Sequence, residues 1–146
     1  MAVEIRVAVE MDEERCLEMI EALTSKIRVD GWSATFEALL GGGRGEVLVA
    51  DEDGTLLGVA TVSYNLAIRY AGEYAQLEEL IVDPAARGKN VGGLLVGTAV
   101  ERARTRGCAE FGLYLLESTE HNRPFYEKYG FERVGSELRQ PLQARS

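Results

Sequence analysis

The stretch ELIVDPAARGKNVGGLL, from Glu79 to Leu95, joins a run of apolar residues to a run of good helix formers. The apolar run ends at Asp83-Pro84, where proline can no longer donate a backbone hydrogen bond to a sheet. Between the two runs lies a basic, glycine-rich turn containing Arg87, Gly88, Lys89, Asn90, Val91, Gly92 and Gly93. The pattern predicts a strand, a turn and a helix.

This turn has the chemistry of an anion site. A helix start leaves backbone N–H groups unsatisfied and carries partial positive charge, and glycines let a phosphate approach them closely. Arg87 and Lys89 add full charges in an otherwise acidic chain, which favours anion binding over the alternative of a plain turn whose glycines ease packing. A Walker A loop is excluded because Lys89 is followed by Asn90, and the Rossmann G-x-G-x-x-G spacing is absent.

The hydrophobic pattern along the chain predicts the order β-α-α-β-β-β-α-β-α-β. Strands are expected at residues 4–9, 46–50, 56–64, 74–82, 110–117 and 131–138. Helices are expected from Asp12 through Ile27, and at 33–40, 91–106 and 122–130. Asp53-Gly54 is a tight-turn signal. Strands in a run, followed by strands alternating with helices, give an α/β (α+β) protein with a mixed sheet covered by helices.

Length and composition suit one domain over residues 1–146, with a frayed tail at 139–146. The net charge of −8 disfavours nucleic acid and anionic membrane as partners, and suits either a cationic substrate or simply a soluble acidic surface. We expect a cytoplasmic protein, because no apolar run approaches a membrane span and the N-terminus lacks a signal-peptide pattern. Two separated cysteines and one histidine do not form a zinc site, so no metal is expected.

The segment VDPAARGKNVGGLL resembles motif A of the GNAT superfamily of N-acetyltransferases, [Q/R]-x-x-G-x-[G/A] after V-D-P. Arg87 and Gly92 match its first and last key positions, and Asn90 replaces the central glycine. Asparagine is the non-glycine residue that best tolerates positive φ, so the turn is expected to survive. The resemblance implies that residues 87–93 bind the pyrophosphate of acetyl-CoA.

A second segment, HNRPFYEKYGF, is similar to motif B of the same family through Asn122, Tyr126, Gly130 and Phe131. Together the two motifs imply the GNAT fold over nearly the whole chain. That fold has a mixed, mostly antiparallel sheet of six to seven strands, helices on both faces and a splay between strands four and five. The resemblance also implies that the backbone of Leu80, Ile81 and Val82 pairs with pantetheine, and that Asn122 and Tyr126 contact the coenzyme.

Transfer of an acetyl group to an alkyl amine first requires removal of a proton, at a cost of roughly 4.6 kcal/mol at pH 7. Glu78 and Glu79 are the candidate bases, and they resemble the L-E-D-x-x-V stretch of polyamine acetyltransferases. Adjacent residues of a regular strand point to opposite faces, so only one of them is expected to face a given pocket. Glu78 is preferred, while the alternative is that both are solvated strand residues.

The family resemblance assigns Tyr126 as the general acid that reprotonates the coenzyme A thiolate. A phenol of pKa near 10 is protonated at pH 7 and can donate to the leaving sulfur. The alternative is that Tyr126 is an aromatic anchor of a short helix. Cys108 has no histidine nearby in the sequence, and His121 reads as a loop or cap residue, so neither is expected to act in catalysis.

The sequence therefore predicts an N-acetyltransferase that uses acetyl-CoA as cosubstrate and acts on a primary amine of a small molecule or protein, through a ternary complex. The alternative from another class is a non-catalytic acyl-CoA-binding sensor or interaction module. An unrelated nucleotide-phosphate binder is disfavoured by the missing Walker and Rossmann spacings. The family resemblance allows a homodimer, and acidic residues point weakly to a cationic acceptor.

Overall fold

The computed structural model describes residues 2–143 and divides the chain into two compact units, residues 1–113 and 114–146. The first unit contains the sheet, α1 (Glu13–Thr24), α2 (Gly31–Leu40) and α3 (Val91–Arg106), and the second contains α4 (Arg123–Glu127). No helix within residues 2–143 combines the length and the apolar character needed to cross a membrane. A single domain over residues 1–146 stays a prediction.

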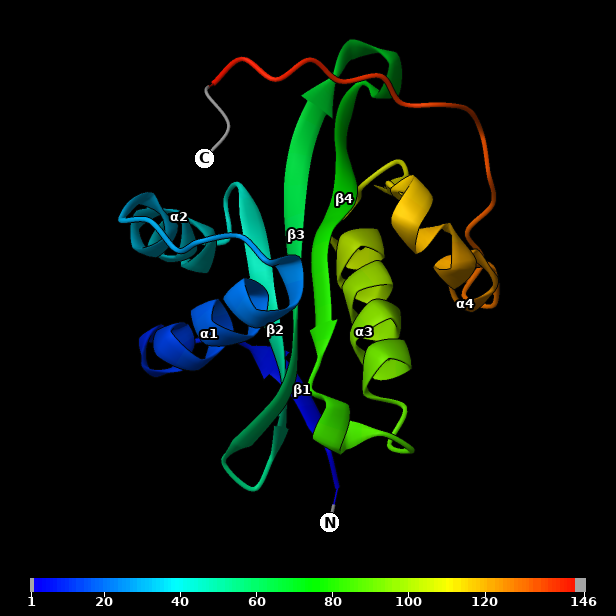
Figure 1. The fold of residues 1–146 in the computed structure, drawn as a ribbon. Coiled ribbons are helices and arrows are strands. Elements are labelled where there is room, and N and C mark those ends of the chain that lie inside the picture. Colours follow the sequence, from blue (N-terminus) through cyan, green and yellow to red (C-terminus); the bar gives the residue numbers. More distant parts are fainter. Residues whose placement is uncertain (1, 144–146) are drawn as a thin grey trace. The chain divides into compact units, whose positions relative to one another are not determined.

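The first unit is built on one five-stranded sheet in the order β1-β2-β3-β4-β5 (Figure 1). Its strands are β1 (Glu4–Val7), β2 (Gly45–Glu52), β3 (Thr55–Ala67), β4 (Gly72–Val82) and β5 (Phe111–Leu113). The first three pairings are antiparallel and the last, between β4 and β5, is parallel. The predicted mixed and mostly antiparallel sheet is therefore confirmed, with fewer strands than expected.

Helices cover both faces of this sheet. On one face α1 (Glu13–Thr24) and α2 (Gly31–Leu40) supply buried Cys16, Leu17 and Phe36, which cluster with Val49 and Val59 of the strands. On the other face α3 (Val91–Arg106) packs directly on β3, because Gly58 has no side chain to hold it off. Successive residues of β3 point to opposite faces of the sheet, so Val59 faces α1 and α2 while Gly58 faces α3.

The turn between β2 and β3 has the geometry that its sequence predicts. Asp53 and Gly54 both have positive φ, 52° and 89°. Two-residue hairpin turns of this kind match the right-handed twist of the strands that they join. The N–H of Gly54 also donates to the Asp51 carboxylate at 2.7 Å. The predicted hairpin is confirmed.

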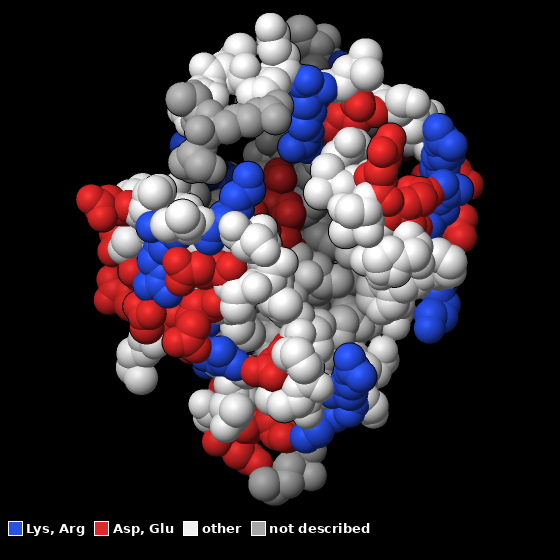
Figure 2. Space-filling model, in the orientation of Figure 1, with Lys and Arg blue, Asp and Glu red and all other residues white. Residues whose placement is uncertain are grey.

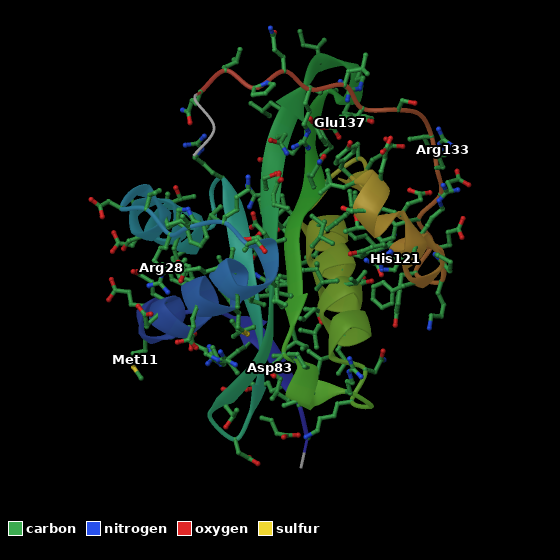
Figure 3. All side chains as sticks on the ribbon, in the orientation of Figure 1. Met11, Arg28, Asp83, His121, Arg133 and Glu137 are labelled. Atoms are coloured by element: carbon green, nitrogen blue, oxygen red, sulfur yellow. The ribbon has the colours of Figure 1, made fainter. Side chains whose placement is uncertain are left out.

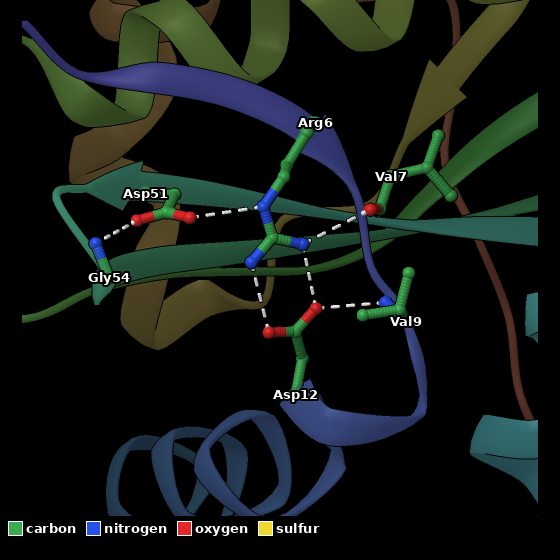
Figure 4. A network of polar contacts seen from close by, with 6 residues as sticks. All are labelled: Arg6, Val7, Val9, Asp12, Asp51 and Gly54. Atoms are coloured by element: carbon green, nitrogen blue, oxygen red, sulfur yellow. Dashed lines mark hydrogen bonds and ion pairs between the residues drawn. The ribbon is translucent and has the colours of Figure 1, made fainter.

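Arg6 of β1 ties the first strand to its neighbours (Figure 4). Its guanidinium donates two hydrogen bonds to Asp12, at 2.8 and 3.0 Å, and one to Asp51 of β2 at 3.1 Å. Asp12 also accepts from the N–H of Val9 at 2.8 Å. The Arg6 hydrogen bond, opposed by burial, lowers the pKa of Asp12. This ionic cluster holds the start of α1 against the sheet.

The predicted length of the first helix is wrong at its C-terminal end. The helix ends at Thr24, and Ser25 follows in the left-handed region with φ of 58°. Ile27, which the apolar spacing places on the helix, lies beyond its end and is 76% exposed. The apolar spacing was right for Cys16, which is buried, and for Ile20, which packs against the core, but left-handed Ser25 ends the helix before Ile27.

The second unit contains a short 3₁₀ helix (Glu117–Asn122) and α4 (Arg123–Glu127), with Pro124 in its first turn. The predicted strand at residues 131–138 is wrong: residues 131–143 form neither helix nor strand. Its apolar residues Val134 and Leu138 are more than nine-tenths exposed, so no buried face stabilises a strand there. The predicted strand at 110–117 is reduced to β5, and the sheet has five strands rather than six or seven. Residues 144–146 of the expected frayed tail lie outside the described residues.

Two glycine-to-alanine changes should alter stability in opposite directions. A Cβ on Gly58 would lie 2.9 Å from Val91 and 3.0 Å from Leu95, so Gly58→Ala should cost about 1–3 kcal/mol through overpacking. Gly97, in the interior of α3, has open space around it, so Gly97→Ala should stabilise by about 0.5–1 kcal/mol. Urea unfolding measures both, and a shift of the same sign in the two variants would contradict the packing of α3 on β3.

Candidate active site

The loop between β4 and α3 has the backbone shape that an anion site needs. Gly88 and Asn90 both have positive φ, 83° and 55°. Asn90 is the N-cap residue of α3 and lies in the left-handed region. The expectation that asparagine keeps this turn in place of glycine is therefore confirmed.

Backbone donors gather at the start of α3. The N–H of Leu94 bonds to the carbonyl of Asn90 at 3.0 Å, which is the first hydrogen bond of the helix. The N–H groups of Val91, Gly92 and Gly93 come earlier in that first turn, where a helix offers no internal acceptor. With the helix dipole, they form a site suited to phosphate oxygens.

The two cations of the loop differ in their surroundings. Lys89 forms an ion pair with Glu52, the last residue of β2, with Nζ to carboxylate distances of 2.7 and 3.0 Å. Arg87 is exposed beside it. Arg87 and Lys89 each add one positive charge to the loop, and Arg87 also matches the first key position of the family motif. The structure adds that Lys89 is tied to the sheet by its ion pair. Arg87 is therefore the better placed of the two to approach a ligand.

Asp83 fixes the junction between β4 and this loop (Figure 3). Its carboxylate accepts from the N–H of Ala85 at 2.8 Å and from Arg15 of α1 at 2.5 Å. These contacts, the backbone bond first, lower the pKa of Asp83. The end of the strand is thus held to α1, and the loop leaves it in a defined direction.

The two candidate bases lie at a β-bulge. Thr61 of β3 stands opposite Glu79, but the next residue, Val62, stands opposite Leu77, so Glu78 is an extra residue on β4. The Thr61 hydroxyl donates to the Glu79 carboxylate, and the Ser63 hydroxyl donates to Glu78 at 2.6 Å. Because Thr61 and Ser63 are two apart on β3, they share one face.

The expectation that Glu78 and Glu79 point to opposite faces is therefore wrong. It assumed a regular strand, and the inserted residue breaks the alternation. Both carboxylates contact hydroxyls on the face of β3 that also carries Val59, the face covered by α1 and α2. Two negative charges can thus act on one ligand.

The two carboxylates have different environments. Glu78 is exposed, whereas Glu79 is half-buried. Burial raises the pKa of Glu79, the hydrogen bond from Thr61 opposes that shift, and the charge of Glu78 adds to it. Glu79 therefore accepts a proton more readily than an ordinary glutamate.

β4 presents an edge beyond the end of β5. The two strands are in register only from Ala75 to Leu77 on β4, while β4 continues to Val82. On its other side, Leu80 to Val82 remain paired with β3. This divergence agrees with the expected splay between strands four and five. It leaves a strand edge of the kind that an extended ligand can pair with.

Tyr126 lies on α4 in the second unit, within an aromatic cluster. Its ring lies 5.0 Å from that of Phe125 and 6.0 Å from that of Phe131, both edge-on. Burial raises the pKa of Tyr126, so the phenol keeps its proton at neutral pH. Asn122 is the residue before α4, and the exposed His121 precedes it (Figure 3).

The sequence reasoning missed Thr61 and Ser63, which hold the two carboxylates. The available signal was the pair of hydroxyls at alternate positions of the mostly apolar stretch LLGVATVSYN.

On the face drawn in Figure 2, acidic and basic side chains are interspersed over the surface.

Residues 10–131 match the model of the Acetyltransferase (GNAT) family, so this chain belongs to that family. It is 29% identical over 143 residues to a glucosamine 6-phosphate N-acetyltransferase of Trypanosoma brucei brucei, with 95% of each chain covered. It is 32% identical to glucosamine 6-phosphate N-acetyltransferase 1 of Oryza sativa subsp. japonica over 106 residues, which are 70% of this chain and 62% of the relative. The family and these names support acetyltransferase activity.

Solved structures agree with this assignment. A transcriptional regulator from Bacillus halodurans C-125 superposes with a TM-score of 0.87 at 27% identity, covering 97% of this chain and 100% of that one. An aminoglycoside N-acetyltransferase, AAC(6')-Iy in complex with CoA, superposes with a TM-score of 0.84 over 98% of this chain and 96% of its own. At 18% identity, the second likeness concerns the fold alone.

The buried carboxylate should leave a pH-dependent mark on stability. A carboxyl whose pKa is higher in the folded than in the unfolded protein binds protons preferentially when folded, so stability falls as pH rises through that interval. The raised pKa of Glu79 therefore predicts that Glu79→Gln increases the free energy of unfolding at pH 7. The gain should vanish below about pH 4, where glutamate is protonated in both states.

Urea unfolding at the two pH values measures the difference, with Glu78→Gln as the matched change at an exposed carboxylate. A gain of equal size at both pH values would show that the charge of Glu79 is not the cause.

Proposed function

We propose that the protein is an N-acetyltransferase that transfers the acetyl group of acetyl-CoA directly to a primary amine of a small molecule or a protein. The observation that carries this proposal is the bulge in β4, which turns two carboxylates onto one face of the strand that leads into the phosphate-binding turn. The proton acceptor on β4 is then followed along the chain by the coenzyme site in the turn after β4.

The coenzyme is held by the turn and by the strand before it. Arg87, Gly88, Lys89 and the first-turn N–H groups of α3 bind the pyrophosphate. The open edge at Leu80 to Val82 pairs with pantetheine and orients the thioester oxygen. Asn122 and Tyr126 complete the contacts with the coenzyme.

The two glutamates divide the work on the amine. Exposed Glu78 attracts the ammonium form, and Glu79 takes its proton, because a carboxylate with a raised pKa is the better base for an amine of high pKa. This reverses the preference for Glu78 that the sequence suggested. The freed lone pair attacks the thioester carbonyl carbon.

The C–S bond then breaks, the leaving thiolate takes the proton of Tyr126, and the second proton lost by the amine nitrogen restores the phenol through solvent. A phenol kept protonated by burial is suited to this role. Direct transfer is favoured over an acyl-enzyme because neither cysteine is activated. Burial raises the pKa of Cys16 to about 12 and also raises that of Cys108, which disfavours the nucleophilic thiolate.

A second candidate function is an acyl-CoA-binding sensor without catalysis. The B. halodurans neighbour is named a transcriptional regulator, which gives this candidate its support. Release of free thiol from acetyl-CoA separates the two functions. We would use glucosamine 6-phosphate, spermidine, kanamycin and a lysine-containing peptide as acceptors. Acceptor-dependent thiol release supports the enzyme, and its absence with all four supports the sensor.

Tyr126→Phe should lower turnover by roughly one to three powers of ten in this assay, the usual range for loss of a general acid. Affinity for CoA should barely change, because the ring and its aromatic neighbours remain. The matched control is Tyr129→Phe, on the same aromatic cluster. Unchanged turnover in Tyr126→Phe would remove the phenol from the mechanism.

Arg87→Ala should weaken CoA binding by about tenfold or more, the scale of one charge-assisted hydrogen bond. Titration calorimetry with CoA measures the affinity. Arg104→Ala is the matched control, because Arg104 lies in the last turn of α3, at the opposite end of the helix. Equal affinity in Arg87→Ala and the parent would place the phosphates elsewhere.

A further inference from the structure

We propose that Thr61 is a positioning residue for acetyl transfer, whose hydroxyl holds both the carboxylate of Glu79 and the bulge that presents it. This inference rests on the proposed function, in which Glu79 accepts the proton of the amine. Thr61 does not touch the reacting atoms and acts through Glu79 alone.

The hydroxyl of Thr61 bonds twice to the same residue. It accepts from the backbone N–H of Glu79 at 3.1 Å and donates to the carboxylate of Glu79. The first bond fixes the strand at the point where the register shifts, since Thr61 and Glu79 are the last pair before the inserted Glu78. The second bond fixes the side chain. One hydroxyl thus sets the backbone and the carboxylate together.

The position of Thr61 in the sheet would otherwise suit an apolar residue. Thr61 is 4% exposed, and it pairs with buried Val47 on β2 and follows buried Val59 on the same face of β3. A valine would fill the same space without a polar group. A buried hydroxyl costs free energy unless it is hydrogen-bonded, so the two bonds to Glu79 account for the threonine.

The Thr61 hydroxyl opposes the effect of burial on the pKa of Glu79. Burial and the charge of Glu78 raise the pKa of Glu79, and the Thr61 hydrogen bond lowers it. Two cations on the helices packed against β4 are paired with other carboxylates: Arg15 of α1 with Asp83, and Arg106 of α3 with Glu73 at the far end of the strand. Near β5, Glu110 accepts from Tyr70. The Thr61 hydroxyl therefore keeps Glu79 ionised, and ready to accept a proton, at a lower pH than burial alone would allow.

Carbon-13 NMR titration of glutamate side-chain carboxyls in the parent and in Thr61→Val tests this inference directly, with the Glu79 signal assigned by its loss in Glu79→Gln. The midpoint of Glu79 should move to higher pH in Thr61→Val and return toward the parent value in Thr61→Ser, which restores the hydroxyl. Thr55→Val, an exposed change of the same kind on β3, should leave it in place. Thr61→Ala is the second hydroxyl-free variant, for use if the valine variant does not fold.

The same variants should change the reaction. With the fastest of the four acceptors, kcat/KM at pH 6 should fall about tenfold in Thr61→Val, the effect of losing one hydrogen bond to a charged group. The acid limb of the pH profile of kcat/KM should move to higher pH in Thr61→Val. In Thr61→Ser, both kcat/KM at pH 6 and the position of this limb should return toward the parent values. A merely structural role would lower the amount of folded protein without moving the limb.

Two failures can be told apart. If Glu79→Gln transfers acetyl groups as fast as the parent, then Glu79 is not the base and the proposed mechanism fails. If Glu79→Gln is inactive, but Thr61→Val titrates and turns over like the parent, the role of Thr61 alone is overturned.

Discussion

The antiparallel ladder between β3 and β4 is the constraint on which the candidate site depends. It runs from the pair Gly58 and Val82 to the pair Ala67 and Gly72, and one inserted residue interrupts it. At one end Gly58 lets α3 pack closely on the sheet, next to the basic turn that follows β4. In the middle, the bulge turns Glu78 and Glu79 to one side. The ladder therefore places the proposed coenzyme site and the proposed proton acceptor relative to one another.

A comparison of buried Glu46 with half-buried Glu79 distinguishes a structural from a functional carboxylate in this sheet. Glu46, on the α3 face, accepts from Arg102 at 3.0 Å and from the Tyr64 hydroxyl at 2.5 Å. Burial raises its pKa, but these bonds outweigh burial and the net shift is downward. Glu79, on the opposite face, has a hydroxyl in place of a cation, and its net shift is upward. Glu46 is a neutralised structural charge, whereas Glu79 keeps the proton affinity that a base requires.

The fold could be predicted in large part because its main elements have strong local signals. The helix at residues 91–106 and the hairpin turn at Asp53-Gly54 appear where the sequence predicts them. The predictions failed where a long-range partner decides the outcome. Residues 131–138 have strand-forming side chains but form no strand, and Val134 and Leu138 among them are exposed; Ile27 continues an apolar period that the left-handed Ser25 interrupts.

The sequence by itself determined the conformation of the basic turn and the family to which the chain belongs. Both depend on residues close together in the chain: Asn90 can adopt positive φ, and the residues around it form the motif. Only the tertiary structure decided which way the carboxylates face and raised the pKa of Glu79. Those properties come from Thr61, on a neighbouring strand 18 residues away, and from burial beneath helices that no local pattern in β4 records.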